Sequence, residues 1–169
     1  ALTSYLEALD YSRVYFTKED IEGFETKYLT QVDDQVRKGG IPAAYEIFAV
    51  YEERIRDRVE LAKKLAVPGA FTYDSDRVGA EHDQLWRNLI EGDLIREKLI
   101  AEALEKKKTK DAEKAAKSGE APKPAKEGDK PEKSIYEKVA DRYDRILKRV
   151  KENTTEDVAA LFIKAIAAS

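Results

Sequence analysis

Residues 42–65, PAAYEIFAVYEERIRDRVELAKKL, carry the pattern that decides the fold. Apolar side chains recur about every four residues along this stretch: Ile47, Tyr51, Ile55, Val59, Ala62 and Leu65. This spacing predicts an amphipathic helix that buries one face, because about 3.6 residues complete one helical turn. Pro42 suits the first turn of that helix, and Val67-Pro68-Gly69 ends it.

The segments on either side show the same periodicity between helix-start and helix-stop signals. Further helices are expected over residues 3–11, 17–38 and 80–105, and from residues 134 and 154 onward. Three of these starts carry a capping box or a variant of it, at Thr17–Asp20, Ser134–Glu137 and Thr154–Asp157. Gly39-Gly40 ends the second helix. Because no stretch alternates convincingly like a strand, the sequence predicts an all-α fold, a bundle of about five helices with a long flexible charged insertion.

Apolar residues define the buried face expected for each of the later helices. In the helix over residues 80–105 they are Leu85, Trp86, Leu89, Ile90, Leu94, Leu99 and Ala103. In the last helix they are Val158, Leu161, Phe162, Ile163 and Ile166. The aromatic residues on helical faces are interpreted as core: Phe24, Tyr45, Phe48, Trp86, Tyr143 and Phe162.

One segment differs in composition from the rest. Residues 105–133 contain 10 lysines, 7 acidic residues and three of the five prolines, and their only apolar side chains are Ala and Pro. Such a segment lacks the apolar surface that would offset the entropy of ordering its backbone. We therefore expect residues 108–133 to be a flexible insertion between N-terminal helices, residues 1–107, and C-terminal helices, residues 134–169, that pack on the first part.

The composition excludes several classes of site and partner. There is no cysteine and a single histidine, so disulfides, cysteine-ligated metals and histidine-rich metal sites are excluded. A net charge of −3 gives no reason to expect nucleic acid, and no apolar run is long enough to insert in a membrane. The chain opens on Ala1 without a signal segment, so we expect an excised or processed fragment.

No residue stands out as catalytic. His82 lies between two acids at a helix start and is interpreted as a solvated surface residue, and no serine lies in a nucleophile motif. A Ser–Lys pair brought together by folding is the minor alternative. Adjacent acids, as in Glu52-Glu53, point about 100° apart on a helix and do not converge on a metal. The lysine-rich segment has interleaved acids and no aromatic, which favours a linker over a nucleic-acid tail. We predict no catalytic, metal-binding or cofactor-binding residue and no cofactor.

Two motifs resemble the N-terminal region of bacterial tail-specific (carboxy-terminal processing) serine proteases. Residues 5–12, YLEALDYS, are similar to the family's Y-L-x-x-L-D-Y-S segment, and are followed by an apolar stretch, the Thr17–Asp20 helix start and Phe24. Residues 153–158, NTTEDV, resemble the family's N-x-x-[ED]-D-V segment. The resemblance covers nearly the whole chain except the insertion.

The resemblance implies a periplasmic serine endopeptidase as the parent protein, although the sequence alone also suits the cytoplasm. Such an enzyme recognises apolar C-terminal tails through a PDZ domain and cleaves with a Ser–Lys dyad, parts that lie outside this chain. The chain would then be a non-catalytic N-terminal module that assists substrate access and holding. Its partners would be the PDZ and protease domains of the same parent chain and protein substrates, with a homo-oligomer as a further option. The alternative is a stand-alone helical adaptor or scaffold that mediates protein–protein interaction.

Overall fold

The computed structural model describes residues 2–71, 82–118 and 132–168, with the side chains of residues 33, 82, 83 and 114–118 outside that description. This part of the chain is all helical and contains no strand, which confirms the predicted fold class. The seven helices are α1 (Leu2–Leu9), α2 (Lys18–Tyr28), α3 (Val32–Arg37), α4 (Pro42–Leu65), α5 (His82–Ser118), α6 (Ile135–Lys151) and α7 (Thr155–Ala167).

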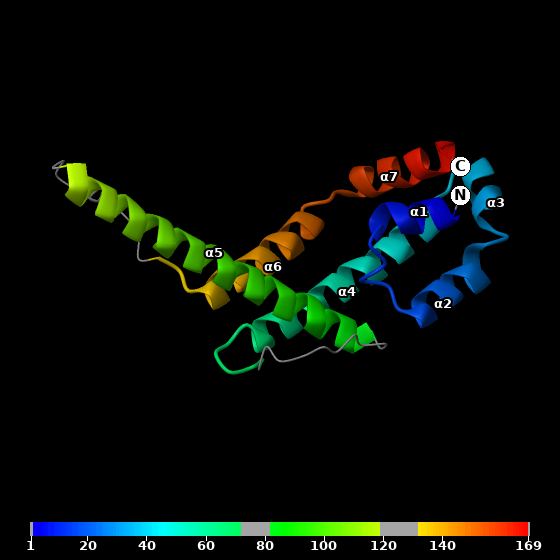
Figure 1. Cartoon of the computed structure of the whole chain (residues 1–169). Coiled ribbons are helices and arrows are strands. Elements are labelled where there is room, and N and C mark those ends of the chain that lie inside the picture. Colours follow the sequence, from blue (N-terminus) through cyan, green and yellow to red (C-terminus); the bar gives the residue numbers. More distant parts are fainter. Residues whose placement is uncertain (1, 72–81, 119–131, 169) are drawn as a thin grey trace.

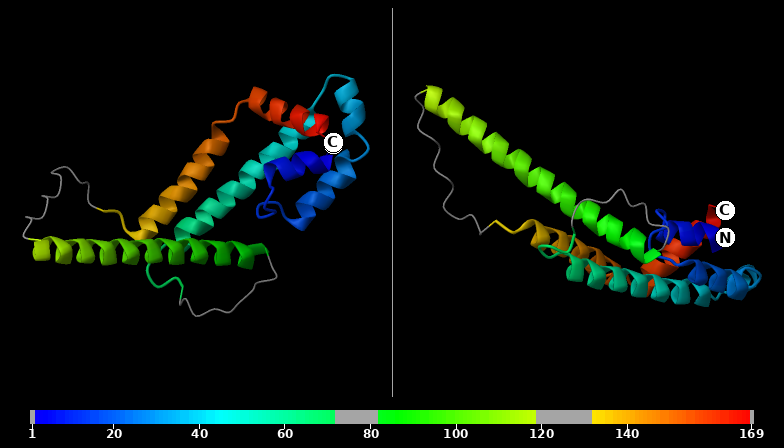
Figure 2. Two further views of the ribbon diagram at one scale, coloured as in Figure 1. Left: turned by 45° about the horizontal axis from the view of Figure 1, so that its top comes forward. Right: turned by 60° about the horizontal axis from the view of Figure 1, so that its bottom comes forward.

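Helix α4 is the element shared by two hydrophobic cores (Figure 1). The first half of α4 packs with α1, α2, α3 and α7, and the second half packs with α5 and α6. Ile47 lies in the first core, and Ile55, Val59 and Ala62 lie in the second, all at most 2% exposed. The predicted apolar stripe of α4 is therefore confirmed. The two ends of the chain lie beside each other at the first core (Figures 1 and 2).

The local start and stop signals act as the sequence predicts. Each of the three capping boxes is formed, with the Thr17, Ser134 and Thr154 side chains accepting from the backbone N–H three residues on. Pro42 occupies the first turn of α4. Gly39 adopts a φ of +76° just past α3, a left-handed conformation that glycine reaches at little steric cost.

The helix predicted over residues 17–38 is wrong, because the structure has two helices there. The backbone N–H of Gln31 donates to the carbonyl of Tyr28, three residues earlier, at 3.0 Å. This bond closes a tighter turn than an α-helix, in which each N–H donates to the carbonyl four residues earlier. This turn places Tyr28 and Val32 in one core, each 2% exposed, while Leu29 is left 63% exposed. Tertiary packing therefore outweighs the local helix propensity, and the described part of the chain has seven helices where about five were expected.

The helix end predicted at Glu105 is also wrong, since α5 continues to Ser118. Residues 106–118 are mainly lysine, alanine and glutamate, which are strong helix formers even where no core covers them. An ion pair between Glu105 and Lys108 at 2.9 Å supports the extension. Residues 108–118 of the predicted insertion are thus helical, and residues 119–131 lie outside the described residues.

Some predicted core residues are exposed. Phe24, Trp86, Tyr143 and Phe162 are buried as predicted, and Phe48 is partly buried against the first core. The prediction is wrong for Tyr45, Leu99, Ala103 and Ile163, which are exposed. Periodicity locates an apolar face but does not say whether another element covers it.

An ion pair joins the start of α2 to α4. The Arg54 guanidinium donates from Nε and Nη2 to the two carboxylate oxygens of Asp20, each at 2.8 Å. Burial alone would raise the pKa of Asp20, but the hydrogen bonds from Arg54 and Thr17 outweigh it and hold this pKa below its usual value.

We expect Asp20→Asn to lower the free energy of unfolding at neutral pH and to lose that effect in acid. A carboxylate whose pKa is lowered on folding contributes stability above its unfolded pKa, about 3.9. This stability disappears as the pH falls through the lowered pKa of the folded state. Urea unfolding over a pH series measures the difference. Asp144→Asn, which removes an exposed ion pair with Lys63, is the control, and the same pH profile in both variants would contradict the assignment.

Candidate functional site

Polar residues at two of the helix starts have structural roles in this structure. Ser134 caps α6, and Asp157 completes the capping box of α7. The side chain of His82 lies outside the described residues, although its backbone begins α5. Within the part of the chain that the structure describes, no three His, Asp or Glu side chains are grouped so as to hold a metal ion.

A buried polar network crosses the second core. Arg58 of α4 lies between the rings of Tyr15 and Tyr143, at 5.1 and 5.5 Å from their centres. The Tyr143 hydroxyl donates to Asp93 of α5 at 2.9 Å, and Asp93 also accepts from Arg142 of α6 at 2.9 Å. Burial raises the pKa of Tyr143 to about 12, so this hydroxyl keeps its proton at neutral pH and acts as a donor. The network joins α4, α5 and α6.

Sequence analysis missed Arg58, although the signal was present. It falls three residues after Ile55 and four before Ala62, which places it on the buried stripe of α4. Arg58 is 8% exposed, and its Nε and Nη1 atoms have no hydrogen-bond partner in the described structure. Because its guanidinium lies against the rings of Tyr15 and Tyr143, we interpret Arg58 as a residue that holds helices together.

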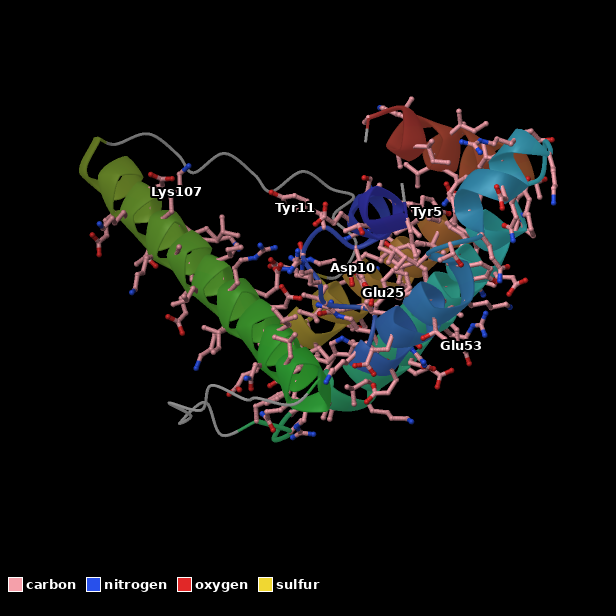
Figure 3. All side chains as sticks on the ribbon, turned by 90° about the vertical axis from the view of Figure 1, so that its right-hand side faces the viewer. Tyr5, Asp10, Tyr11, Glu25, Glu53 and Lys107 are labelled. Atoms are coloured by element: carbon pink, nitrogen blue, oxygen red, sulfur yellow. The ribbon has the colours of Figure 1, made fainter. Side chains whose placement is uncertain are left out.

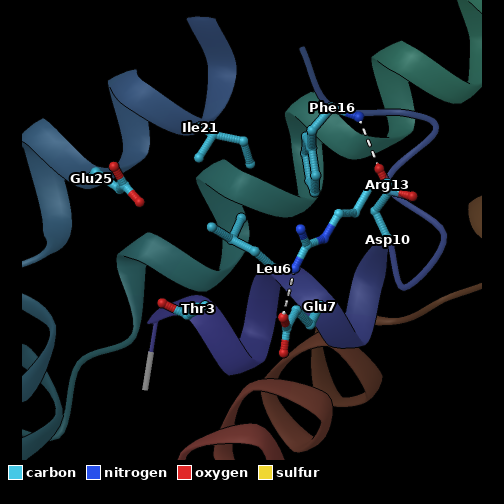
Figure 4. Close-up of a pocket in the computed structure, with 8 residues that line it drawn as sticks. All are labelled: Thr3, Leu6, Glu7, Asp10, Arg13, Phe16, Ile21 and Glu25. Atoms are coloured by element: carbon cyan, nitrogen blue, oxygen red, sulfur yellow. Dashed lines mark hydrogen bonds and ion pairs between the residues drawn. The ribbon is translucent and has the colours of Figure 1, made fainter. Parts of the chain in front are cut away.

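A pocket of about 310 Å³ opens between α1 and α2 (Figure 4). Its apolar lining comes from Leu6, Phe16 and Ile21, and its polar lining from Thr3, Glu7, Asp10, Arg13 and Glu25. This volume is at the low end for ligand pockets and suits one or two side chains of a peptide. Sequence analysis did not predict it, because its lining comes from two helices and the loop between them.

Asp10 holds the loop that forms one wall of the pocket. Its carboxylate accepts from the backbone N–H groups of Val14, Tyr15 and Phe16 at 2.8–3.0 Å. The chain turns sharply here, and Arg13 adopts a φ of +53°, which is uncommon for a residue with a side chain. Asp10 is 5% exposed, so its charge is directed to the backbone.

The charged side chains at the mouth of the pocket do not all have a partner of opposite charge. The Arg13 side chain reaches back to Glu7 at 3.2 Å, and these two charges offset each other. The side chain of Glu25, on the α2 side, forms no ion pair or hydrogen bond with any residue that the structure describes. The pocket therefore combines an apolar lining with an uncompensated negative charge.

The second surface feature is the outer part of α5. Residues 95–118, which we call the arm, lie beyond Leu94, the last buried residue among the described side chains of this helix, and extend away from both cores (Figures 1 and 2). Four large apolar side chains on the arm are between 38% and 59% exposed: Ile95, Leu99, Ile100 and Leu104. Clustered exposed apolar side chains mark a surface that contacts other proteins.

The pocket and the arm offer apolar contacts and charge, and these two features support binding.

Two comparisons with known proteins match this chain to the same kind of protein. A family model described as "Tail specific protease N-terminal domain" matches residues 1–169. The curated protein "Tail-specific protease" of Haemophilus influenzae is 26% identical over 163 residues, which is 96% of this chain. The chain spans about a fifth of that relative, 21% of its length. No solved structure matches significantly. Among the described helices, none is both long enough and apolar enough to cross a membrane.

Proposed function

Because this chain belongs to the family of tail-specific protease N-terminal domains, we propose that it is the non-catalytic helical module of a periplasmic serine endopeptidase. In this proposal the module packs on the PDZ and protease domains of its parent chain. It assists the access and holding of protein substrates that carry apolar C-terminal tails, and the parent cleaves them with a Ser–Lys dyad.

The observation that carries the proposal is the exposed apolar surface of the arm. Leu99 and Ile100 lie on a helix that extends away from both cores, where an unfolded polypeptide can reach them. A module without catalytic residues affects turnover through binding, positioning or gating, and apolar side chains at an open surface bind unfolded chains without demanding one sequence.

We expect removal of residues 1–169 from the parent protease to impair cleavage of a whole protein more than cleavage of a short tailed peptide. A peptide reaches the active site unaided, whereas a folded protein must be held while it unfolds. The measurement is kcat/KM for both substrates, with intact and truncated enzyme.

A milder variant tests the same idea with the module in place. Leu99→Gln combined with Ile100→Gln changes only exposed side chains and is expected to reproduce the selective loss in part. Glu53→Gln, on the exposed surface of α4, is the control. Equal losses on both substrates would assign the module a purely structural role, and no loss on either would refute the proposal.

A further inference from the structure

The charges of this chain are distributed unevenly. Residues 105–133 hold 10 lysines and 7 acidic residues, a net charge of +3. Since the whole chain has a net charge of −3, the remainder carries −6. Residues 105–118 of the arm belong to this positive segment, whereas the residues that line the pocket belong to the negative remainder.

One face of the arm is both apolar and positively charged. Residues spaced by three or four positions share a face of a helix, and six exposed residues of α5 fall within an arc of about 100°. They are Arg96, Leu99, Ile100, Ala103, Lys107 and Lys110, and we call this set the arm face. Each acidic residue between Gly92 and Lys110 lies outside this arc. The arm face thus places two large apolar side chains between cations and has no negative charge.

The pocket between α1 and α2 has the complementary chemistry. Its apolar lining suits a leucine or isoleucine side chain, and Glu25 supplies the negative charge that a flanking lysine or arginine needs. Tyr11 directly follows Asp10, a lining residue, and is 89% exposed, so its ring is open to a cation. Figure 3 shows Tyr11 and Glu25 on the body and Lys107 on the separate arm.

We propose that the arm face of one copy of this chain binds in the pocket of a second copy. The occupant is a second copy because both halves of the contact belong to this chain and α5 packs on α4 and α6, which hold the arm away from its own pocket (Figure 2). Leu99 or Ile100 enters the pocket, with Arg96 or Lys107 beside Glu25. The inference does not rest on the proposed protease function, but both use Leu99 and Ile100, so a second copy and a substrate compete for the arm face.

The two surfaces that meet in this contact determine how the copies are arranged. Two different surfaces meet, so the contact is heterologous and joins copies head to tail. A pocket of about 310 Å³ covers few side chains, so the association is weak, and it weakens further in high salt because exposed charges contribute to it.

Two charge reversals test the contact by sedimentation velocity on the full chain over a concentration series. Glu25→Lys and Lys107→Glu each place like charges together and are expected to raise the dissociation constant about tenfold. Glu53→Lys is the matched control, because it makes the same charge change at an exposed site on α4 (Figure 3), and it should associate like the wild type. Circular dichroism checks that each variant keeps its helices, and Glu25→Gln replaces the first variant if it does not.

Mixing the two reversed variants is the decisive step. The altered pocket of the Glu25→Lys variant is complementary to the altered arm of the Lys107→Glu variant. The unchanged arm of the first variant and the unchanged pocket of the second also keep the wild-type contact, so only the pairing of a variant with itself is repulsive. The mixture is therefore expected to recover the association that each variant alone loses, with the two variants alternating head to tail. A wild type that stays monomeric at every concentration would overturn the proposal. So would association that survives both reversals, or a mixture that recovers no association, since these results place the contact elsewhere or assign the pocket to another partner.

Discussion

Asp10→Ala is expected to lower the free energy of unfolding by about 3–4 kcal/mol, because it leaves three backbone N–H groups without an acceptor. These groups belong to Val14, Tyr15 and Phe16, and the Asp10 side chain that satisfies them is 5% exposed. A buried donor that loses its partner costs about 1–3 kcal/mol, and partial access of water to the loop lowers the sum. Urea denaturation followed by circular dichroism measures the change.

The control for this substitution lies one turn earlier on α1. Glu7→Ala removes the exposed pair with Arg13 and is expected to change the free energy of unfolding by less than about 0.5 kcal/mol. Asp10→Asn, which keeps the shape but has one acceptor oxygen fewer, should lie between the two. A cost below about 1 kcal/mol for Asp10→Ala would mean that the loop finds other partners and that the wall of the pocket does not depend on Asp10.

Trp86→Ala is the second large effect, with an expected loss of about 3–5 kcal/mol, the usual range for a large aromatic side chain truncated in a core. Trp86 is 5% exposed, and its indole N–H donates to the Val14 carbonyl. Ile90, one turn further along α5, is fully buried in the second core. The substitution therefore removes buried area and leaves a cavity between α5 and the loop.

Trp86→Phe separates the two contributions, because it keeps most of the packing and loses only the hydrogen bond, at a cost of about 1 kcal/mol. A change under about 1 kcal/mol for Trp86→Ala in urea unfolding would show instead that this residue is peripheral. Asp10 and Trp86 bind the two polar groups of the same residue, Val14, so we expect their effects to be non-additive in the double variant.

The features that the sequence predicted are those set by neighbouring residues. A capping box needs only a Ser or Thr and an acid three positions on, so Thr17, Ser134 and Thr154 marked the three helix starts correctly. The apolar stripe of α4 is likewise local, since its period alone indicates the buried face.

The features that were missed depend on contacts between distant parts of the chain. The break after Tyr28 exists because Tyr28 and Val32 both enter the first core. The extension of α5 to Ser118 was missed for a different reason, because a lack of large apolar residues excludes a core but leaves helix propensity intact. The pocket depends on how α1 and α2 lie together, which no single segment encodes.

The position of α4 has a consequence for how this molecule unfolds. Its 24 residues supply side chains to both cores, with Ile47 in one and Ile55 in the other. If either core melted, half of α4 would lose its cover, and the helix would fray toward the half that remained packed. The two cores therefore form a single cooperative unit with one transition, although each has its own set of surrounding helices. The arm lies outside this unit, because none of its described side chains is buried in either core, and we expect its outer turns to open without disturbing the rest.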